Sequence, residues 1–212
     1  MKSNGMDLTS SEMGHGRYIA PAFGGGVHTV GAGERLDLDF VILPGQSQDL
    51  RVEVDLVGEG AEVTLRGLWL CPADERVSVT VTVHHRVPGC RSSQLFKGIV
   101  GGTASVRFDG TIIVAPDAQQ TEAYQENHNL LLSETALVET SPQLEIYADD
   151  VKCSHGATVG RLNEDELFYM RSRGIPEADA RILQMVSFLF PVTANLSETQ
   201  KADIESALSS ML

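Results

Sequence analysis

The stretch Leu50-Arg51-Val52-Glu53-Val54-Asp55-Leu56 carries an apolar residue at every second position. Because successive side chains of a β-strand point to opposite faces, this alternation predicts a strand with one buried and one solvent-facing side. The stretch Val77-Ser78-Val79-Thr80-Val81-Thr82-Val83 repeats the pattern. Further strand-like runs lie at residues 36–43, 61–70, 93–100, 105–114, 129–132, 136–138, 144–147 and 151–159. The chain is therefore predicted to be mainly β over most of its length.

Two architectures fit this series of strands. Short strands at regular spacing favour an antiparallel sandwich or barrel. Against this, no Asn-Gly or Asp-Gly pair joins two long strand-like runs, as a tight hairpin would require. The alternative is a solenoid, in which Gln119, Gln120 and Asn127 could stack as amide ladders between rungs. On the pattern alone, the sandwich is the preferred interpretation and the solenoid the alternative.

A helical pattern replaces the alternation near the C-terminus. Asn163 suits the N-cap of a first helix, because three acidic residues follow it in the first turn, and Gly174 suits its C-terminal end. Pro176 fits the first turn of a second helix, and Pro191 is expected to end it. A third helix is predicted to start at Ser197, where a capping-box pattern begins.

These patterns divide the chain into a loose, glycine-rich arm (1–26), a β body (27–160) and a C-terminal helical domain (161–212). The length of 212 residues and the hydrophobic content of 42% are typical of a globular protein. A net charge of −13 argues against a nucleic-acid partner, which would need a basic face. The sequence shows no apolar run of membrane-spanning length and no secretory signal, so we expect a cytoplasmic protein without a membrane partner.

The segment Asp149-Asp150-Val151-Lys152-Cys153-Ser154-His155-Gly156 holds the residues best suited to chemistry. In a strand, Cys153 and His155 point to the same face, about 7 Å apart along the chain. A thiolate and an imidazole are ligands that zinc, copper and iron–sulfur clusters accept. A closed structural metal site needs four ligands, so the others would have to come from further strands or a second subunit. Plain packing and a Cys–His nucleophile pair remain open as alternatives.

The remaining cysteines and a histidine pair give weaker signals. Cys71 and Cys90 are expected to be small buried hydrophobes, because three widely spaced cysteines form no disulfide framework. His84 and His85 would point to opposite faces of one strand, so they cannot chelate a metal together.

The second half of the chain carries four ordered strings of residues. They are Phe108-x-Gly110-x-Ile112-x-Val114, Gln119-x-Thr121-x-Ala123-x-Gln125-x-Asn127-x-Asn129-Leu130-Leu131-Leu132-Ser133, Pro142-x-Leu144-Glu145-Ile146-x-Ala148-Asp149-Asp150-Val151-Lys152-Cys153-Ser154-His155-Gly156-Ala157-Thr158 and Leu167-Phe168-Tyr169-Met170-x-Ser172-Arg173-Gly174-Ile175. Together these strings resemble the SufB/SufD family of iron–sulfur cluster assembly scaffolds, and its SufD branch in particular. The resemblance covers residues 105–190 and extends more loosely back to residue 27.

The resemblance implies a right-handed parallel β-helix followed by a small C-terminal helical domain, in place of the sandwich. It also implies a non-catalytic scaffold subunit of a SufBCD-type complex, not an enzyme. Such a chain would pair through its β-helix with a SufB-like chain or a second copy of itself. The nascent cluster would form at that interface, where Cys153 and His155 are the expected cluster-assembly residues and transient metal ligands. No cofactor is expected to be bound stably.

The resemblance further implies that the C-terminal helices dock a SufC-like ABC ATPase. The expected docking residues are the apolar side chains of the first two helices: Leu167, Met170, Ile182, Val186 and Leu189. The chain departs from the family pattern because it begins close to the β body, without the helical region that usually precedes it. The sequence also carries the SufD-like Cys153-Ser154-His155-Gly156 in place of a SufB-like segment with extra cysteines, so we do not expect this chain alone to hold a stable cluster.

Two other classes of protein remain open. A β-solenoid carbohydrate-active enzyme would use carboxylates such as Glu145, Asp149 and Asp150 as acids. The single tryptophan, Trp69, and an aromatic content of 6% leave few side chains for stacking on sugars. A purely structural oligomer would instead use the exposed ends of a solenoid for pairing.

Overall fold

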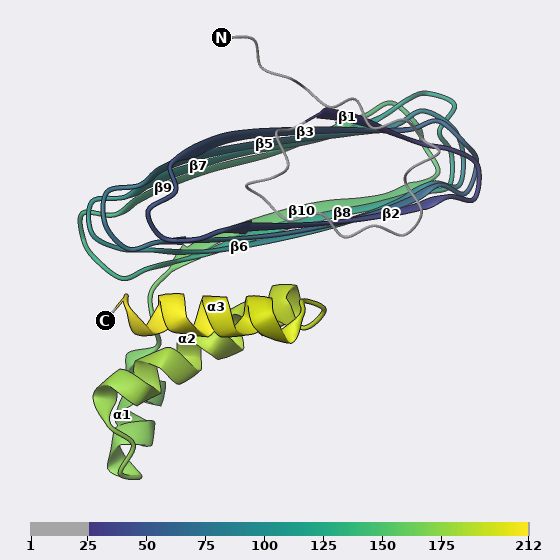
Figure 1. Ribbon diagram of the computed structural model, residues 1–212. Helices are drawn as coiled ribbons and strands as arrows, with labels where there is room; N and C mark the ends of the chain where they lie inside the picture. The colour runs from purple at the N-terminus through teal and green to yellow at the C-terminus, as the bar shows by residue number, and fades with distance from the viewer. Residues whose placement is uncertain (1–25, 212) are drawn as a thin grey trace, which may run out of the picture.

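The computed structural model describes residues 26–211, which form a flattened β-solenoid followed by three helices (Figure 1). Every turn of the solenoid contributes one strand to each of two five-stranded parallel sheets. The first sheet contains, in spatial order, β1 (Gly26–Val30), β3 (Gln48–Leu56), β5 (Arg76–His85), β7 (Ser105–Val114) and β9 (Leu137–Ile146). The second contains β2 (Arg35–Ile42), β4 (Glu62–Cys71), β6 (Arg91–Val100), β8 (Thr121–Leu131) and β10 (Val151–Gly160).

This arrangement confirms the β-helix that the family resemblance implied, and the antiparallel sandwich preferred on pattern alone is wrong. All strand neighbours run parallel, so each connection passes around the solenoid to the opposite sheet instead of turning back as a hairpin. This is why no Asn-Gly or Asp-Gly turn joins two long strands in the sequence. The predicted N-terminal arm lies outside the described residues, except for Gly26, which begins β1.

The strand β8 begins well before the predicted run at residues 129–132. Its inward-facing side chains are mostly polar but fully buried, and they include Gln125, Asn127 and Asn129. The alternation of apolar and polar residues that marks strands such as β3 and β5 is therefore absent here. The amide ladder predicted for Gln119, Gln120 and Asn127 is wrong in its residues: Gln119 bonds to backbone groups and Asn127 to Asn129 of its own strand. The rung-to-rung amide contact joins Gln125 to Gln94, its register partner on β6.

The core is built from rows of inward-facing residues stacked in register across the strands. Trp69, Phe96 and Phe108 stack at its centre, with ring centroids 4.8–6.5 Å apart. The indole N–H of Trp69 donates a hydrogen bond of 3.0 Å to Asn129 Oδ1. This bond passes over Gly98, where a Cβ would collide with both partners. The lack of a side chain at this position therefore makes room for the bond. The only tryptophan is therefore an interior residue and offers no surface for a sugar.

A row of alternating charges crosses the outer face of the second sheet. Ion pairs join register neighbours with N–O distances of 3.9, 3.6, 3.7 and 3.0 Å. The row runs in the order Arg35, Glu62, Arg91, Glu122 and Lys152. Each exposed pair contributes little to stability, but a shift of two residues in any strand would interrupt the row. The row therefore favours the observed register.

The helices α1 (Glu164–Ser172), α2 (Glu177–Thr193) and α3 (Glu198–Ser209) have the predicted starts. Asn163 caps α1 by accepting hydrogen bonds from two backbone N–H groups, and Ser197 caps α3 in a complete capping box. One prediction is wrong: Pro191 lies inside α2, which continues to Thr193. The backbone of Ala194 still donates a hydrogen bond to Phe190 O, so the proline does not break the last turn.

The helices lie against the outer face of the second sheet (Figure 1). The strands of this sheet end in outward-facing apolar residues such as Leu68, Leu70 and Ile99, which pack against Met185 and Leu189 of α2. Because both faces of the strands are covered here, burial is almost continuous at their C-terminal ends. Among residues 26–211, no helix is long and apolar enough to cross a membrane.

The buried histidine of β5 generates a prediction about stability and pH. Burial lowers the pKa of His85 to about 4, with a smaller contribution from the charge of His84. The folded chain therefore binds this proton less readily than the unfolded chain, whose histidines have a pKa of about 6.5. The free energy of unfolding should be unaffected by this group above pH 6.5 and decrease as the pH falls towards 4, by up to about 3 kcal/mol.

The variant His85→Leu removes this titration, and leucine fits because Leu56 occupies the neighbouring position of the same inward row. Urea unfolding between about pH 7 and pH 4 should show a smaller loss of stability in His85→Leu than in the native chain. His128→Gln is the control, because the side chain of His128 is 25% exposed on the outer face and lies beside Glu126. Equal losses in the native chain and His85→Leu would contradict the assignment.

Candidate functional site

The strand β10 lies at the edge of the second sheet, where only β8 adjoins it among the described residues. Its register with β8 places Cys153 next to Ala123 and His155 next to Gln125. Ala123 and Gln125 are completely buried inside the solenoid, so Cys153 and His155 share the inward face at its last turn. In the first sheet, β9 is the corresponding last strand. The C-terminal end of the solenoid thus presents a thiol and an imidazole at an open rim.

The two side chains differ in environment. Cys153 is half-buried and packs against the apolar cluster of Ile112, Val114 and Ala123. Burial raises the pKa of its thiol, although a hydrogen bond with the backbone of Ala123 partly offsets this effect. The protonated thiol is therefore favoured until a metal ion or another positive charge approaches. His155 is exposed to solvent at the same rim.

The neighbouring residues of β10 face outward. Lys152 bonds to Glu122 at 3.0 Å and ends the row of alternating charges, and Ser154 is exposed. Asp149 and Asp150 are exposed in the turn before β10. The backbone N–H of Asp150 donates to Gln119 Oε1, which anchors this turn to the preceding rung.

Within residues 26–211, no group of three or more His, Cys, Asp or Glu side chains gathers in a metal-binding arrangement. Cys153 and His155 therefore supply at most two ligands from this part of the chain, fewer than a closed site requires. The arrangement can donate a soft sulfur and an imidazole nitrogen to a metal species held against the open end by further ligands. Cys153 contacts apolar side chains and the backbone of Ala123, and these contacts supply no orienting group for a Cys–His nucleophile pair.

Among the described residues, His84, His85 and His128 contact other side chains, and Cys71 and Cys90 are buried. His85 contacts Ser92 Oγ at 2.9 Å in the interior, whereas His84 lies on the outer face, as the alternation predicted. His128 contacts Thr158 at 2.8 Å on the outer face. Cys71 and Cys90 are buried, as expected, and burial raises the pKa of both thiols, that of Cys71 to about 12.

A polar interior lies directly beneath the open end, and among its residues only Asn127 was expected to stack in an amide ladder. Gln125 donates to Gln94 at 2.9 Å, and Asn129 donates to Asn127 at 2.7 Å, all with side chains buried within the solenoid. The signal was present as a polar residue at every second position of β8. This polar alternation was not recognised as a strand, because the buried positions of a strand are usually apolar.

The helical residues expected to dock an ATPase face the interior of the helical domain. Leu167 and Leu189 are buried, and Met170, Ile182 and Val186 are half-buried in the same apolar cluster. The helices expose other large apolar side chains, namely Phe168, Tyr169, Leu183 and Phe190.

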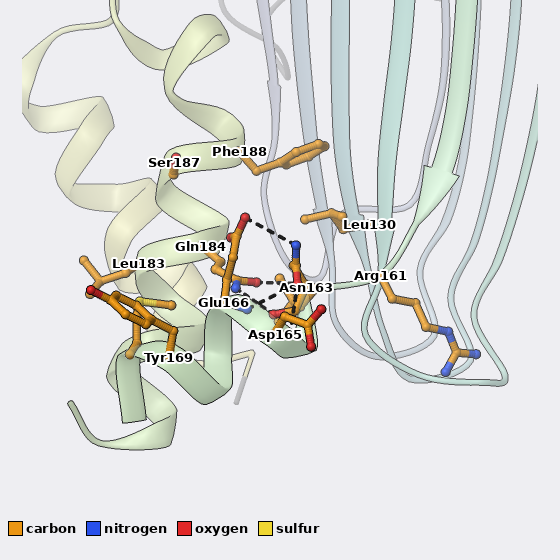
Figure 2. A pocket seen from close by; sticks show the side chains of 12 residues that line it. Leu130, Arg161, Asn163, Asp165, Glu166, Tyr169, Leu183, Gln184, Ser187 and Phe188 are labelled. Carbon is orange, nitrogen blue, oxygen red and sulfur yellow. Dashed lines mark hydrogen bonds between the residues drawn. The ribbon is translucent and has the colours of Figure 1, made fainter. Parts of the chain in front are cut away.

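A hollow of about 660 Å³ lies between α1, α2 and the end of β8 (Figure 2). Tyr169, Leu183 and Leu130 supply apolar surface to its wall. Asn163 joins the two helices there, because its backbone exchanges hydrogen bonds with the Gln184 side chain at 3.0 and 2.9 Å.

Comparison with known proteins identifies the family. The model of the SUF system FeS cluster assembly SufBD core domain matches residues 29–188. The chain is 43% identical over 143 residues to iron–sulfur cluster assembly protein SufD of Escherichia coli, covering 68% of this chain and 33% of that protein. It is 32% identical over 142 residues to SufD of Bacillus subtilis, covering 67% and 32%. Protein ABCI7, chloroplastic, of Arabidopsis thaliana is 39% identical over 142 residues, covering 65% and 29%.

The chain thus spans about a third of the length of these curated relatives. The family match itself covers most of the chain and includes the last turns of the solenoid, α1 and most of α2. The protein therefore belongs to the SufBD family of iron–sulfur cluster assembly proteins.

Proposed function

We propose that this chain is a non-catalytic scaffold on which an iron–sulfur cluster forms at a seam between two protein chains. The observation that carries the proposal is the position of Cys153 and His155 on the inward face of the last strand, at the open end of the solenoid. A thiol and an imidazole at an edge supply half of a ligand set, and an adjoining chain would complete it. The cluster would be cargo, with no cofactor bound stably to this chain and a cytoplasmic location.

The open end also suits pairing with another chain. The edge strands β9 and β10 are each ten residues long, and they expose Leu137, Ile146 and Val159. Unpaired edge strands with apolar side chains are templates for strand addition from a partner. We propose a SufB-like scaffold chain or a second copy of this chain as the partner at this end.

We expect His155→Ala to lower the yield of cluster in anaerobic reconstitution with the SufB-like partner by about tenfold, because it removes a ligand from the seam. Absorbance and bound iron and sulfide measure the yield. Ser154→Ala is the matched control, since Ser154 is exposed on the opposite face of the same strand. Equal yields from His155→Ala and the native chain would remove the histidine from the mechanism.

We further propose that a SufC-like ABC ATPase docks at the hollow between α1 and α2, through exposed side chains such as Tyr169 and Leu183. Of the residues first expected at this contact, Met170 lines the hollow itself, whereas the other four pack inside the helical domain and would support the surface. Apolar groups lining a concave helical surface are typical of protein contacts.

The double variant Tyr169→Ser/Leu183→Ser should reduce capture of the cognate ATPase in a pull-down at least tenfold, because it removes two apolar contacts without disturbing the core. Circular dichroism checks that the fold is retained. Phe190→Ser is the control, since Phe190 is 63% exposed, close to the 60% of Tyr169, but lies outside this hollow. Undiminished capture by the double variant would place the ATPase elsewhere.

A further inference from the structure

We propose that Gln125 is a positioning residue for His155. Its side-chain oxygen, which is unpartnered in the structure, would accept a hydrogen bond from one ring N–H of the imidazole and leave the other ring nitrogen with its lone pair directed out of the solenoid. The inference deepens the proposed function, because it concerns how this chain prepares His155 for a metal species at the seam.

The first observation is a change of character along one inward row. Register pairs place Leu38, Leu65, Gln94, Gln125 and His155 next to one another on the five strands of the second sheet. The row is apolar at the N-terminal end of the solenoid and becomes polar in the three turns that lead to the open end. A polar row inside a solenoid is costly unless its members bond to one another.

The second observation is the direction of the amide ladder. Gln125 Nε2 donates to Gln94 Oε1 at 2.9 Å, towards the N-terminal end. In a ladder of this kind, the amide that donates towards one rung directs its oxygen towards the next rung. Gln125 Oε1 is buried and has no hydrogen-bond partner in the structure. The next residue in register on that side is His155.

The third observation is the space made for this amide. A Cβ at Gly110, on the opposite sheet, would collide with the Oε1, Nε2 and Cδ atoms of Gln125. The glycine therefore leaves room for the amide to extend across the interior beneath the last turn. Gly110 lies in the row that ends at Pro142 of β9. The Gln125 amide is thus held in place from the adjoining rung and from the facing sheet.

The chemistry of metal-binding histidines gives this arrangement a purpose. A histidine that binds a metal through one nitrogen usually donates its other N–H to a carbonyl or carboxylate oxygen, which fixes its tautomer and orientation. Residues in register on neighbouring strands lie about 4.8 Å apart, a separation that an amide and an imidazole can bridge with one hydrogen bond. The unpartnered oxygen of Gln125 meets this requirement.

The test reads the tautomer of His155 in the full chain labelled with ¹⁵N-histidine. Long-range ¹⁵N–¹H spectra are recorded above pH ~8, and His155→Ala identifies the signals. We expect one dominant tautomer in the native chain and a mixture of both in Gln125→Leu. Gln94→Leu is the matched control, because it deletes the same Gln94–Gln125 hydrogen bond but keeps the oxygen below His155; it should retain the single tautomer.

A tautomer of His155 that is mixed in the native chain, or unchanged in Gln125→Leu, would overturn the inference and would indicate that water satisfies the buried oxygen. If Gln125→Leu does not fold, Gln125→Met provides the same comparison with a side chain of similar length. No cluster is present in this experiment, so its outcome is independent of the proposed function. A tautomer that becomes mixed in Gln125→Leu, combined with equal cluster yields from His155→Ala and the native chain, would support the positioning role and remove His155 from the proposed mechanism.

Discussion

Every inward-facing side chain of the solenoid must fit its neighbours on the adjoining strands. Parallel strands in register place corresponding residues of successive turns directly next to one another. This constraint explains why Gly98 lies where the indole of Trp69 reaches Asn129, and why Gly110 lies where Gln125 crosses the interior. It also explains why polar residues inside the solenoid occur together. An isolated buried amide would lack a partner, whereas neighbours such as Gln94 and Gln125 can satisfy each other.

The same constraint ends abruptly at β9 and β10, because no described strand follows them in either sheet. Cys153 and His155 occupy positions that are interior in every preceding turn, yet they lie at a rim that a partner can reach. Side chains inside the solenoid are covered on all sides by their neighbours, whereas side chains at the open end can contact a partner or a metal species. The function we propose follows from this difference between the last turn and the turns before it.

Much of this architecture could be predicted from local patterns. The alternation at Leu50–Leu56 marked the strands, and the capping residues Asn163 and Ser197 marked two helix starts. The parallel connection of the strands was less accessible, because alternation is the same in parallel and antiparallel sheets. The resemblance to the SufB/SufD family was needed to choose between them. The strand at Gln125 was missed because its burial depends on partners in other rungs.

The candidate site shows the same division between local and long-range information. The shared face of Cys153 and His155 followed from the period of a strand, but their place at an edge depends on which strands adjoin β10. The orientation of Leu167 and Leu189 likewise could not be read from helical spacing alone. An apolar stripe can face the body of its own protein or a partner, and here the sheet residues Leu68 and Ile99 complete an internal cluster.

Hydrogen–deuterium exchange of the backbone amides, with and without the SufB-like chain, tests most directly whether the open end is the seam. The account predicts that amides of β9 and β10 become protected on complex formation, whereas those of β1, the edge of the first sheet at the other end, do not change. Unchanged exchange in β9 and β10 upon stable complex formation would contradict it.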